Sequence, residues 1–154
     1  MEIILAENHG FCYGVKRAVE MADEAANSEG KSYTLGPIIH NPQVVGRLES
    51  KGVSPIQEVA DIDEGTMIIR SHGVGPAIYA EAEEKGLHIL DATCPHVKKA
   101  QQDAKSVIED GMTLVILGEK NHPEVKSINL WANNKGIIIE DEESAEKLQI
   151  VEKM

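Results

Sequence analysis

Aromatic residues are scarce in this sequence of 154 residues: they make up 3%, with one Phe and one Trp. A hydrophobic core must therefore be built from Ile, Val, Leu, Ala and Met, and the hydrophobic content of 42% is sufficient for one. Extensive disorder is not expected, because disordered chains are poor in hydrophobic residues. The length suits one compact domain or two small ones.

Basic residues are also few, and the formal net charge is -11. This charge argues against a nucleic-acid partner, because binding to a phosphate backbone needs a basic face. A small anionic ligand remains compatible with it, since helix N-termini, His and a few cations can bind one locally.

Long apolar runs are missing as well. No run approaches the ~20 residues of a membrane span, and residues 1–7 are too short and too acidic for a secretory signal. We therefore expect a cytoplasmic protein without a membrane partner.

Only two cysteines are present, Cys12 and Cys94, and they lie far apart in the sequence. In the absence of an export signal, free thiols, metal ligation or catalysis are favoured over a structural disulfide.

Short apolar segments alternate with segments of helical periodicity along the whole chain. The pattern predicts strands at 3–6, 32–35, 66–70, 87–91, 113–117 and 136–140. It predicts helices at 15–26, from 42 to about 51, at 76–85, 95–110 and 123–132, and from about 144. Alternating strands and helices indicate an α/β fold built from small parallel-sheet units. We place the boundary near Cys94–Pro95, with residues 1–94 as a first unit and residues 95–154 as a second unit that is incomplete at its C-terminal end.

Five of the predicted strands lead into polar loops that carry a Cys or a His. These loop residues are Cys12, His40, His72, Cys94, and His122 with Glu124. Ligands of open parallel sheets bind at the carboxyl ends of the strands. If the strands run parallel, all five loops can therefore face one cleft.

Both cysteines are expected at the N-terminal end of a helix, where the helix dipole favours the thiolate form that ligates metals. Cys12 lies between Gly10 and Gly14, which allow close approach of the backbone, whereas Cys94 precedes Pro95. A buried cysteine in a tight turn is an equally good interpretation of the first motif alone. Two cysteines are too few for an ordinary Cys-ligated cluster. A zinc site of two Cys and two His is conceivable, but closely spaced ligand pairs such as C-x-x-C are absent.

Three histidines, His40, His72 and His122, each lie beside a predicted helix start. Imidazole groups together with the backbone N–H groups of a helix N-terminus suit a diphosphate. A single His in a loop is more often a solvated or capping residue, and we keep that interpretation for the remaining histidines, His9, His88 and His96. Glu124 is the best candidate for proton transfer, although a glutamate in the first turn also stabilises a helix through its dipole.

Five motifs, taken together and in order, resemble the 4-hydroxy-3-methylbut-2-enyl diphosphate reductase family. They span the ranges 10–18, 40–41, 71–74, 91–95 and 122–125: Gly-Phe-Cys-Tyr-Gly-Val-Lys-Arg-Ala, His-Asn, Ser-His-Gly-Val, Asp-Ala-Thr-Cys-Pro and His-Pro-Glu-Val.

The resemblance implies three similar α/β units around a 4Fe-4S cluster held by three cysteines, of which Cys12 and Cys94 match two. It implies that His40, His72 and His122 bind the substrate, and that Glu124 and His122 are catalytic in proton delivery. The reaction would be a two-electron reductive dehydration that yields isopentenyl and dimethylallyl diphosphate, the terminal step of non-mevalonate isoprenoid biosynthesis. A ferredoxin or a flavodoxin would donate the electrons.

The chain departs from the family pattern in three respects. Family members are longer, the third cluster cysteine is absent, and Ser127 occupies a position where glycine is expected. We therefore expect a truncated form that does not turn over substrate alone and that self-associates through exposed apolar surface. Two alternatives remain open: a non-catalytic diphosphate-binding module or shortened paralogue without a cluster, and a small redox or zinc protein that uses Cys12 and Cys94.

Overall fold

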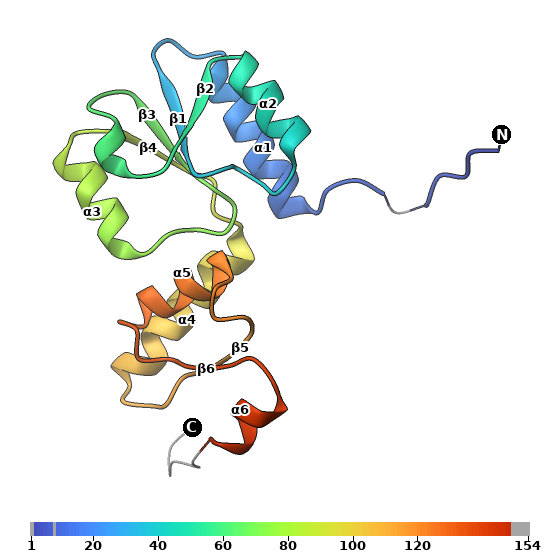
Figure 1. The fold of residues 1–154 in the computed structure, drawn as a ribbon. Coiled ribbons are helices and arrows are strands. Elements are labelled where there is room, and N and C mark those ends of the chain that lie inside the picture. Colours follow the sequence, from blue (N-terminus) through green and yellow to red (C-terminus); the bar gives the residue numbers. More distant parts are fainter. Residues whose placement is uncertain (1, 8, 149–154) are drawn as a thin grey trace.

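The computed structural model describes residues 2–7 and 9–148 and confirms the α/β class (Figure 1). Within these residues the helices are α1 (Tyr13–Ala26), α2 (Pro42–Ser50), α3 (Pro76–Glu84), α4 (Pro95–Glu109), α5 (Pro123–Trp131) and α6 (Glu142–Glu146), with a 3-10 turn at Val59–Asp61. The strands are β1 (Ser32–Leu35), β2 (Val53–Ile56), β3 (Thr66–Ile69), β4 (His88–Asp91), β5 (Val115–Leu117) and β6 (Ile137–Ile139).

The first sheet is parallel throughout and has the strand order β2-β1-β3-β4. Its two central strands are joined to their neighbours by crossover helices, as parallel pairing requires. The carboxyl ends of β1, β3 and β4 therefore meet at one edge, where the loops carrying His40, His72 and Cys94 begin.

Helices cover both faces of this sheet. One apolar cluster lies under α1 and α2 and includes Ala18, Ala22 and Ile68, whereas the other lies under α3 and includes Met67 and Ile69. Neighbouring residues of β3 thus belong to opposite clusters, because side chains alternate along a strand. Met67, Ile68 and Ile69 of β3 are fully buried, which is typical of a parallel sheet covered on both faces.

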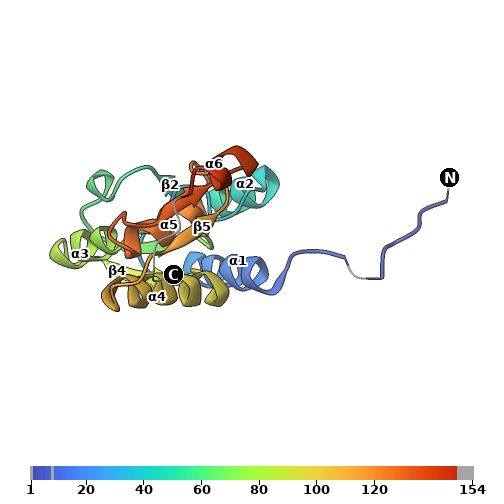
Figure 2. The ribbon, with the colours of Figure 1, turned by 90° about the horizontal axis from the view of Figure 1, so that it is seen from below.

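The second sheet consists of the parallel pair β5-β6. Helices α4 and α5 pack against one another, and α6 packs against β6. This part of the chain lies below the first sheet in Figure 1, and α4 runs alongside α5 and β5 in the view from below (Figure 2). The two sheets occur on either side of Cys94–Pro95, but the domain boundary placed there stays a proposal, and residues 149–154 of the expected second unit lie outside the described residues.

One strand was not predicted. The segment Val53–Ile56 forms β2, which pairs with β1 at the edge of the first sheet. Pro55 lacks a backbone N–H and is tolerated there because an edge strand has one unpaired side.

The strand predicted at 3–6 is wrong. Residues 3–6 form no strand, and the side chains of Ile3, Ile4 and Leu5 are 74%, 84% and 75% exposed. The segment leads away from the body of the molecule (Figure 1). An apolar run becomes a strand only where a sheet edge is available, and within the described residues β1–β4 pair only with one another. Cys12 therefore follows an extended segment and not a sheet strand.

None of the helices in the described ranges combines the length and the apolar character that a membrane span needs.

Candidate functional site

Helix N-termini position most of the predicted site residues. Cys12, Cys94 and His122 are the N-cap residues of α1, α4 and α5, and His40 precedes Asn41, the N-cap of α2. The Asn41 side chain accepts a hydrogen bond from the backbone N–H of Val44 over 3.1 Å, which fixes this helix start. Positive helix ends therefore surround the residues predicted to bind a metal and an anion.

The structure brings the two cysteine loops together. A Cβ atom placed on Gly14 would lie 2.5 Å from Sγ of Cys94, so the first turn of α1 approaches the Cys94 thiol as closely as a glycine allows. Cys12, two residues earlier, is exposed, and Cys94 is partly buried; both are free thiols. Arg17 of α1 donates a hydrogen bond to the carbonyl oxygen of Thr93 over 3.2 Å and thereby joins α1 to the Cys94 loop.

The three predicted histidines form a cluster. The ring centroids of His40 and His72 are 4.7 Å apart, and those of His72 and His122 are 5.9 Å apart. The backbone N–H of Cys94 donates to the carbonyl oxygen of Ser71 over 2.9 Å, which links the histidine cluster to the cysteine loops. These loops, expected to face one cleft, thus lie close together, but His40 and His72 line one cavity and His122 lines another.

His72 is the central member and is unusual in its protonation. Burial lowers the pKa of His72 to about 4, and the positive charges of His40, Arg70 and His122 contribute in the same direction. Its Nδ1 atom is buried and has no hydrogen-bond partner within the part of the chain that the structure describes. At neutral pH the ring is therefore uncharged and has an unused polar atom.

His122 and Glu124 are held together at the start of α5. Nδ1 of His122 accepts a hydrogen bond from the backbone N–H of Glu124 over 3.2 Å. Because Nδ1 is the acceptor, the proton of the neutral ring lies on Nε2. The two side chains line a cavity of about 390 Å³ next to β5 and the loop after it.

A second cavity, of about 230 Å³, connects the cysteine and histidine regions. It is lined by Phe11 and Val15 from the start of α1 and by Ile39, His40, Asn41, Ser71 and His72. A ligand here touches imidazole groups on one side and the Cys12 loop on the other.

A buried hydrogen-bond network supports the site, and no sequence signal indicated it. Oγ of Ser127 donates to the carbonyl oxygens of His72 and Glu124, both over 2.9 Å, and accepts from Nε2 of Gln101 over 3.2 Å. A hydroxyl has one proton, so the two donated bonds share it or alternate. Ser127 and Gln101 are each 2% exposed. Ser127, the departure from the family pattern, thus ties the His72 loop to α5.

Asp91 anchors the strand end that leads to Cys94. Burial raises the pKa of this carboxyl, but hydrogen bonds from Lys98 and Thr93 and the charge of Lys98 together lower it below its usual value. Its carboxylate also accepts from the Tyr79 hydroxyl over 3.1 Å, and burial followed by the Asp91 charge raises the pKa of Tyr79 to about 12. The Cys94 loop is therefore held in place by an ionised side chain.

The cysteines suit part of a metal-ligand set. Within residues 2–7 and 9–148, no group of three or more His, Cys, Asp or Glu side chains is placed to hold a metal ion. An iron–sulfur cluster takes three or four thiolates, and the sequence contains two cysteines. Cys12 and Cys94, at adjacent helix N-termini beside Gly14, fit two positions of such a set, and the chain alone cannot complete it.

Curated relatives match this chain over most or all of its length. It is similar to the 4-hydroxy-3-methylbut-2-enyl diphosphate reductases of Geobacter metallireducens, with 50% identity over 154 residues, and Geotalea daltonii, with 52% identity over 148 residues. These matches cover 100% and 96% of the chain but 55% and 52% of the relatives. The chain thus spans about half the length of the curated relatives.

Solved structures agree with these matches. A structure of (E)-4-hydroxy-3-methyl-but-2-enyl diphosphate reductase, the terminal enzyme of the non-mevalonate pathway, is 49% identical and superposes with a TM-score of 0.80. The E-1-hydroxy-2-methyl-but-2-enyl-4-diphosphate reductase of Plasmodium falciparum is 31% identical, with a TM-score of 0.89. The matches cover 92% and 94% of this chain and 52% and 46% of those chains.

A family model described as LytB protein matches residues 3–154. Since this match takes in nearly every residue of the sequence, the chain belongs to the LytB protein family.

Proposed function

We propose that this chain is part of a reductase that converts 4-hydroxy-3-methylbut-2-enyl diphosphate to isopentenyl and dimethylallyl diphosphate. In this reaction the allylic C–O bond breaks and a C–H bond forms. Two electrons and two protons are consumed, and the hydroxyl leaves as water. A ferredoxin or a flavodoxin supplies the electrons in the proposal, and the compartment is the cytoplasm.

The observation that carries the proposal is the cluster of His40, His72 and His122 beside the cysteine loops. Ring separations of 4.7 and 5.9 Å place three imidazoles within reach of one diphosphate. The N-termini of α2 and α5 lie next to His40 and at His122, and they add backbone N–H donors and a positive dipole. A protein with a net charge of -11 thus has a local environment here that suits an anion.

In this proposal His72 binds as a neutral hydrogen-bond donor or takes up a proton when the ligand arrives. Its low pKa reflects burial and neighbouring positive charge. A diphosphate placed against the ring supplies negative charge, which raises that pKa.

Glu124 and His122 are the proposed proton-delivery residues. Both line the cavity at the end of β5, and the backbone N–H of Glu124 fixes the ring orientation of His122. With the proton of His122 on Nε2, the free side of the ring can donate to the leaving hydroxyl, and Glu124 can relay a proton to it.

Cys12 and Cys94 are the proposed ligands of a 4Fe-4S cluster, whose third thiolate lies outside these 154 residues. When bound, the cluster supplies the electrons of the reduction. The role of the chain is to hold two thiolates at helix N-termini, where the thiolate form is favoured. By itself the chain is proposed to be inactive and to self-associate.

The test is turnover by the natural gene product, purified without oxygen and supplied with a chemically reduced electron donor. We expect both products, and we expect Glu124→Gln to lower kcat by about 100-fold or more with little change in KM. Glu119→Gln is the matched control, because Glu119 lines the same cavity but is exposed, whereas Glu124 is partly buried. Equal losses in the two variants would contradict the role of Glu124.

Metal analysis separates the alternatives. A natural product that is colourless and free of iron but binds inorganic diphosphate would be the non-catalytic module or shortened paralogue. Zinc in place of iron would favour the small zinc protein.

A further inference from the structure

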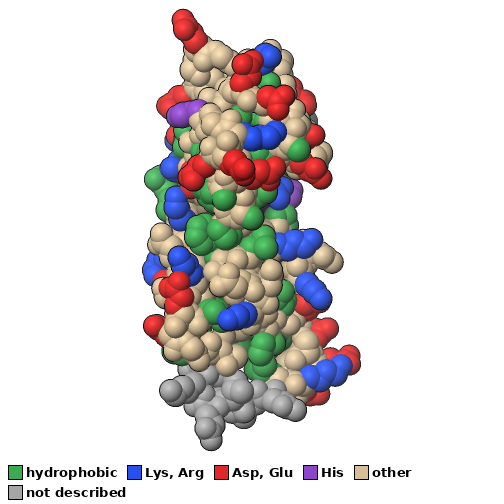
Figure 3. Space-filling view, turned by 90° about the vertical axis from the view of Figure 1, so that its left-hand side faces the viewer, with side chains coloured by type: hydrophobic (Ala, Val, Ile, Leu, Met, Phe, Trp, Pro, Cys, Tyr) green, Lys and Arg blue, Asp and Glu red, His purple; other side chains and the backbone are tan. Residues whose placement is uncertain are grey.

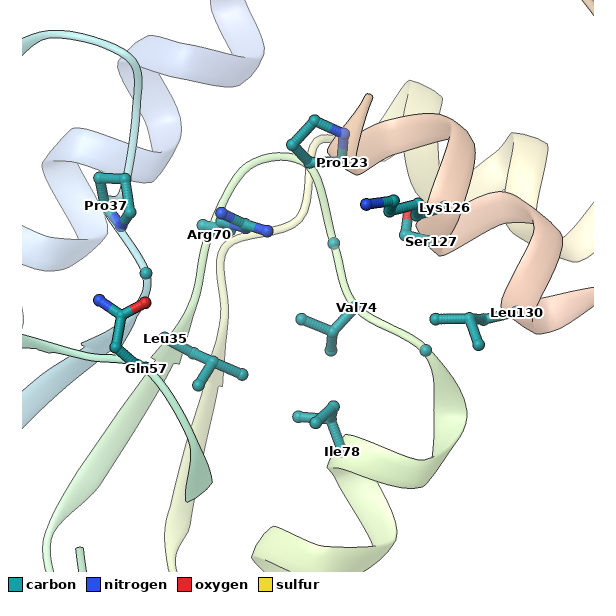
Figure 4. Close-up of a pocket in the computed structure, with 13 residues that line it drawn as sticks. Leu35, Pro37, Gln57, Arg70, Val74, Ile78, Pro123, Lys126, Ser127 and Leu130 are labelled. Carbon is teal, nitrogen blue, oxygen red and sulfur yellow. The ribbon is translucent and has the colours of Figure 1, made fainter. Parts of the chain in front are cut away.

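A third cavity, of about 330 Å³, lies between the first sheet and α5 (Figure 4). Its lining combines residues at the carboxyl ends of β1 and β3 with residues of the loop before α3 and one face of α5. The lining includes Leu35, Arg70, Val74, Ile78, Lys126 and Leu130.

Arg70 is a partly buried cation without a partner. Its side chain makes no hydrogen bond or ion pair with any of the described residues, and its Nε atom is fully enclosed. Removing a guanidinium from water is costly unless an anion or hydrogen-bond acceptors replace the lost water. Because Arg stays protonated in proteins, this cost is not relieved by loss of the proton.

The chain is shaped around this side chain. Nη1 of Arg70 would lie 2.9 Å from a Cβ atom on Gly36, whose φ of +70° is also a conformation that favours glycine. The loop after β1 therefore leaves room for the guanidinium in its present place.

A second cation points into the same space. Lys126 on α5 forms no ion pair with the described residues, and Figure 4 shows its amine directed toward Arg70. The lining residues include no Asp or Glu. Two unpaired cations therefore line one cavity in a protein whose net charge is -11. Across the band where the two parts of the molecule meet, Figure 3 likewise shows hydrophobic side chains flanked by basic ones.

The rest of the cavity is apolar. Val74, Ile78 and Leu35 lie on the side of the cavity facing α3, and Leu130 lies on α5 (Figure 4). Leu130 is 42% exposed, so a hydrocarbon placed here would remove apolar surface from water.

This cavity is separate from the proposed substrate site. It shares no lining residue with the cavity at His40 and His72 or with the cavity at His122 and Glu124. On α5, Pro123, Lys126, Ser127 and Leu130 form one face, whereas His122, Val125 and Ile128 line the other cavity.

We propose that Arg70 and Lys126 form a second ligand site, which binds a small organic anion with a phosphate or carboxylate at one end and a short hydrocarbon at the other. The guanidinium pairs with two oxygens of the anion, Lys126 adds a point charge, and the apolar wall takes the hydrocarbon. The site goes beyond the proposed reductase function, since it uses none of the residues assigned to that reaction.

The test is calorimetric titration of n-butyl phosphate, pentanoate and inorganic phosphate into the natural gene product carrying His40→Ala and His122→Ala. These two substitutions silence the proposed substrate site. We expect one remaining site that binds n-butyl phosphate or pentanoate more tightly than inorganic phosphate. Which of the two binds more tightly shows whether the physiological ligand carries a phosphate or a carboxylate.

Two further substitutions in this background locate the binding. Arg70→Gln is expected to weaken binding at least tenfold. Arg47→Gln is the matched control and should leave binding unchanged, because Arg47 lies on the surface of α2 and pairs with Asp23. Lys126→Glu changes an exposed side chain, so the fold tolerates it, and we expect it to weaken binding at least tenfold as well.

Absence of binding in the silenced background, or unchanged affinity in both Arg70→Gln and Lys126→Glu, would overturn the second site. Neither result bears on diphosphate binding by the histidines, which is measured in the protein with His40 and His122 intact. Should Arg70→Gln fail to fold, Lys126→Glu decides alone.

Discussion

His72 makes the stability of the protein depend on pH in a particular direction. The pKa of His72 is about 4 in the folded chain, below the usual histidine value of 6.5, because the ring is buried beside other positive groups. Between these values the unfolded chain binds the proton more readily, so stability is highest above about pH 6.5 and falls as the pH drops toward 4. We expect a loss on the order of 2 kcal/mol across that window, measured by urea unfolding at pH 7 and pH 4.5.

The matched variant is His72→Gln, which should abolish most of that pH dependence. His88→Gln is the control, since His88 is an exposed residue on β4 outside the histidine cluster. An unchanged pH dependence in His72→Gln would mean that other groups titrate in this window.

Ligand binding should involve proton uptake by the same residue. A diphosphate next to His72 raises a pKa that burial has lowered, so binding is accompanied by proton uptake. Calorimetry of inorganic diphosphate in two buffers with different ionisation enthalpies measures this uptake. Identical binding heats in both buffers would place the anion away from His72.

Ser127 stabilises the folded chain through three hydrogen-bond contacts at a buried position. Ser127→Ala leaves Nε2 of Gln101 and the carbonyl oxygen of His72 without that partner, and we expect a loss of about 1–3 kcal/mol in urea unfolding. Ser106→Ala, on the exposed face of α4, is the control and should change stability by less than about 0.5 kcal/mol. A shift in the NMR signals of the His72 ring in Ser127→Ala alone would show that the serine positions that loop.

At the scale of elements, the first turn of α1 is fitted to the Cys94 thiol. Gly14→Ala places a Cβ atom 2.5 Å from Sγ of Cys94, so helix or loop must move. We expect destabilisation by about 1–3 kcal/mol and altered reactivity of Cys94 toward a thiol reagent. Gly46→Ala is the control within α2, where an added Cβ atom meets nothing within 4 Å apart from the backbone of its own helix, and it should stabilise the chain by about 0.5–1 kcal/mol. Equal changes in stability for Gly14→Ala and Gly46→Ala would contradict the close contact between α1 and the Cys94 thiol.

Elements with strong local signals were predictable. Asn41-Pro42 and His122-Pro123 mark helix starts through side-chain capping and the fixed φ of proline, and the structure places α2 and α5 there. Pro95 marks the start of α4 through its fixed φ alone, because Cys94 forms no side-chain cap. The edge strand β2 was missed because its four residues include Ser54 and Pro55, which weaken a strand pattern. The segment 3–6 was misassigned because apolar character does not reveal whether a partner strand is available.

The sequence indicated which Cys and His side chains form the candidate site, but not the buried residues that hold them in place. Cys and His types in consecutive loops indicated which side chains converge, since parallel strands bring their carboxyl ends together. A buried serine or glutamine in a helix, such as Ser127 or Gln101, leaves no recognisable pattern in the sequence. The same holds for Arg70, whose missing partner is visible only once the neighbouring side chains are placed.

At the scale of the whole molecule, polar and aromatic contacts join the two sheets. Nε1 of Trp131 donates to the carbonyl oxygen of Val74 over 2.9 Å, and the rings of Trp131 and Tyr79 meet edge to face at 6.1 Å. With Gln101 and Ser127, these contacts fix α5 against the loop between β3 and α3. Two of the five aromatic residues of the sequence, Tyr79 and Trp131, therefore lie at this junction.

The contact between the first turn of α1 and the Cys94 thiol has a mechanical consequence. Anything held by both Cys12 and Cys94 acts as a cross-link that closes a loop of roughly 80 residues, and a covalent link of that size restricts the unfolded chain by on the order of 4 kcal/mol. Iron removal by a chelator should accordingly lower the Tm of the natural gene product and increase amide exchange at the starts of both α1 and α4. If exchange rises at only one helix, the two thiols do not share a ligand. If exchange rises at both helices, a group bound by Cys12 and Cys94 would be what holds the start of α1 against the start of α4.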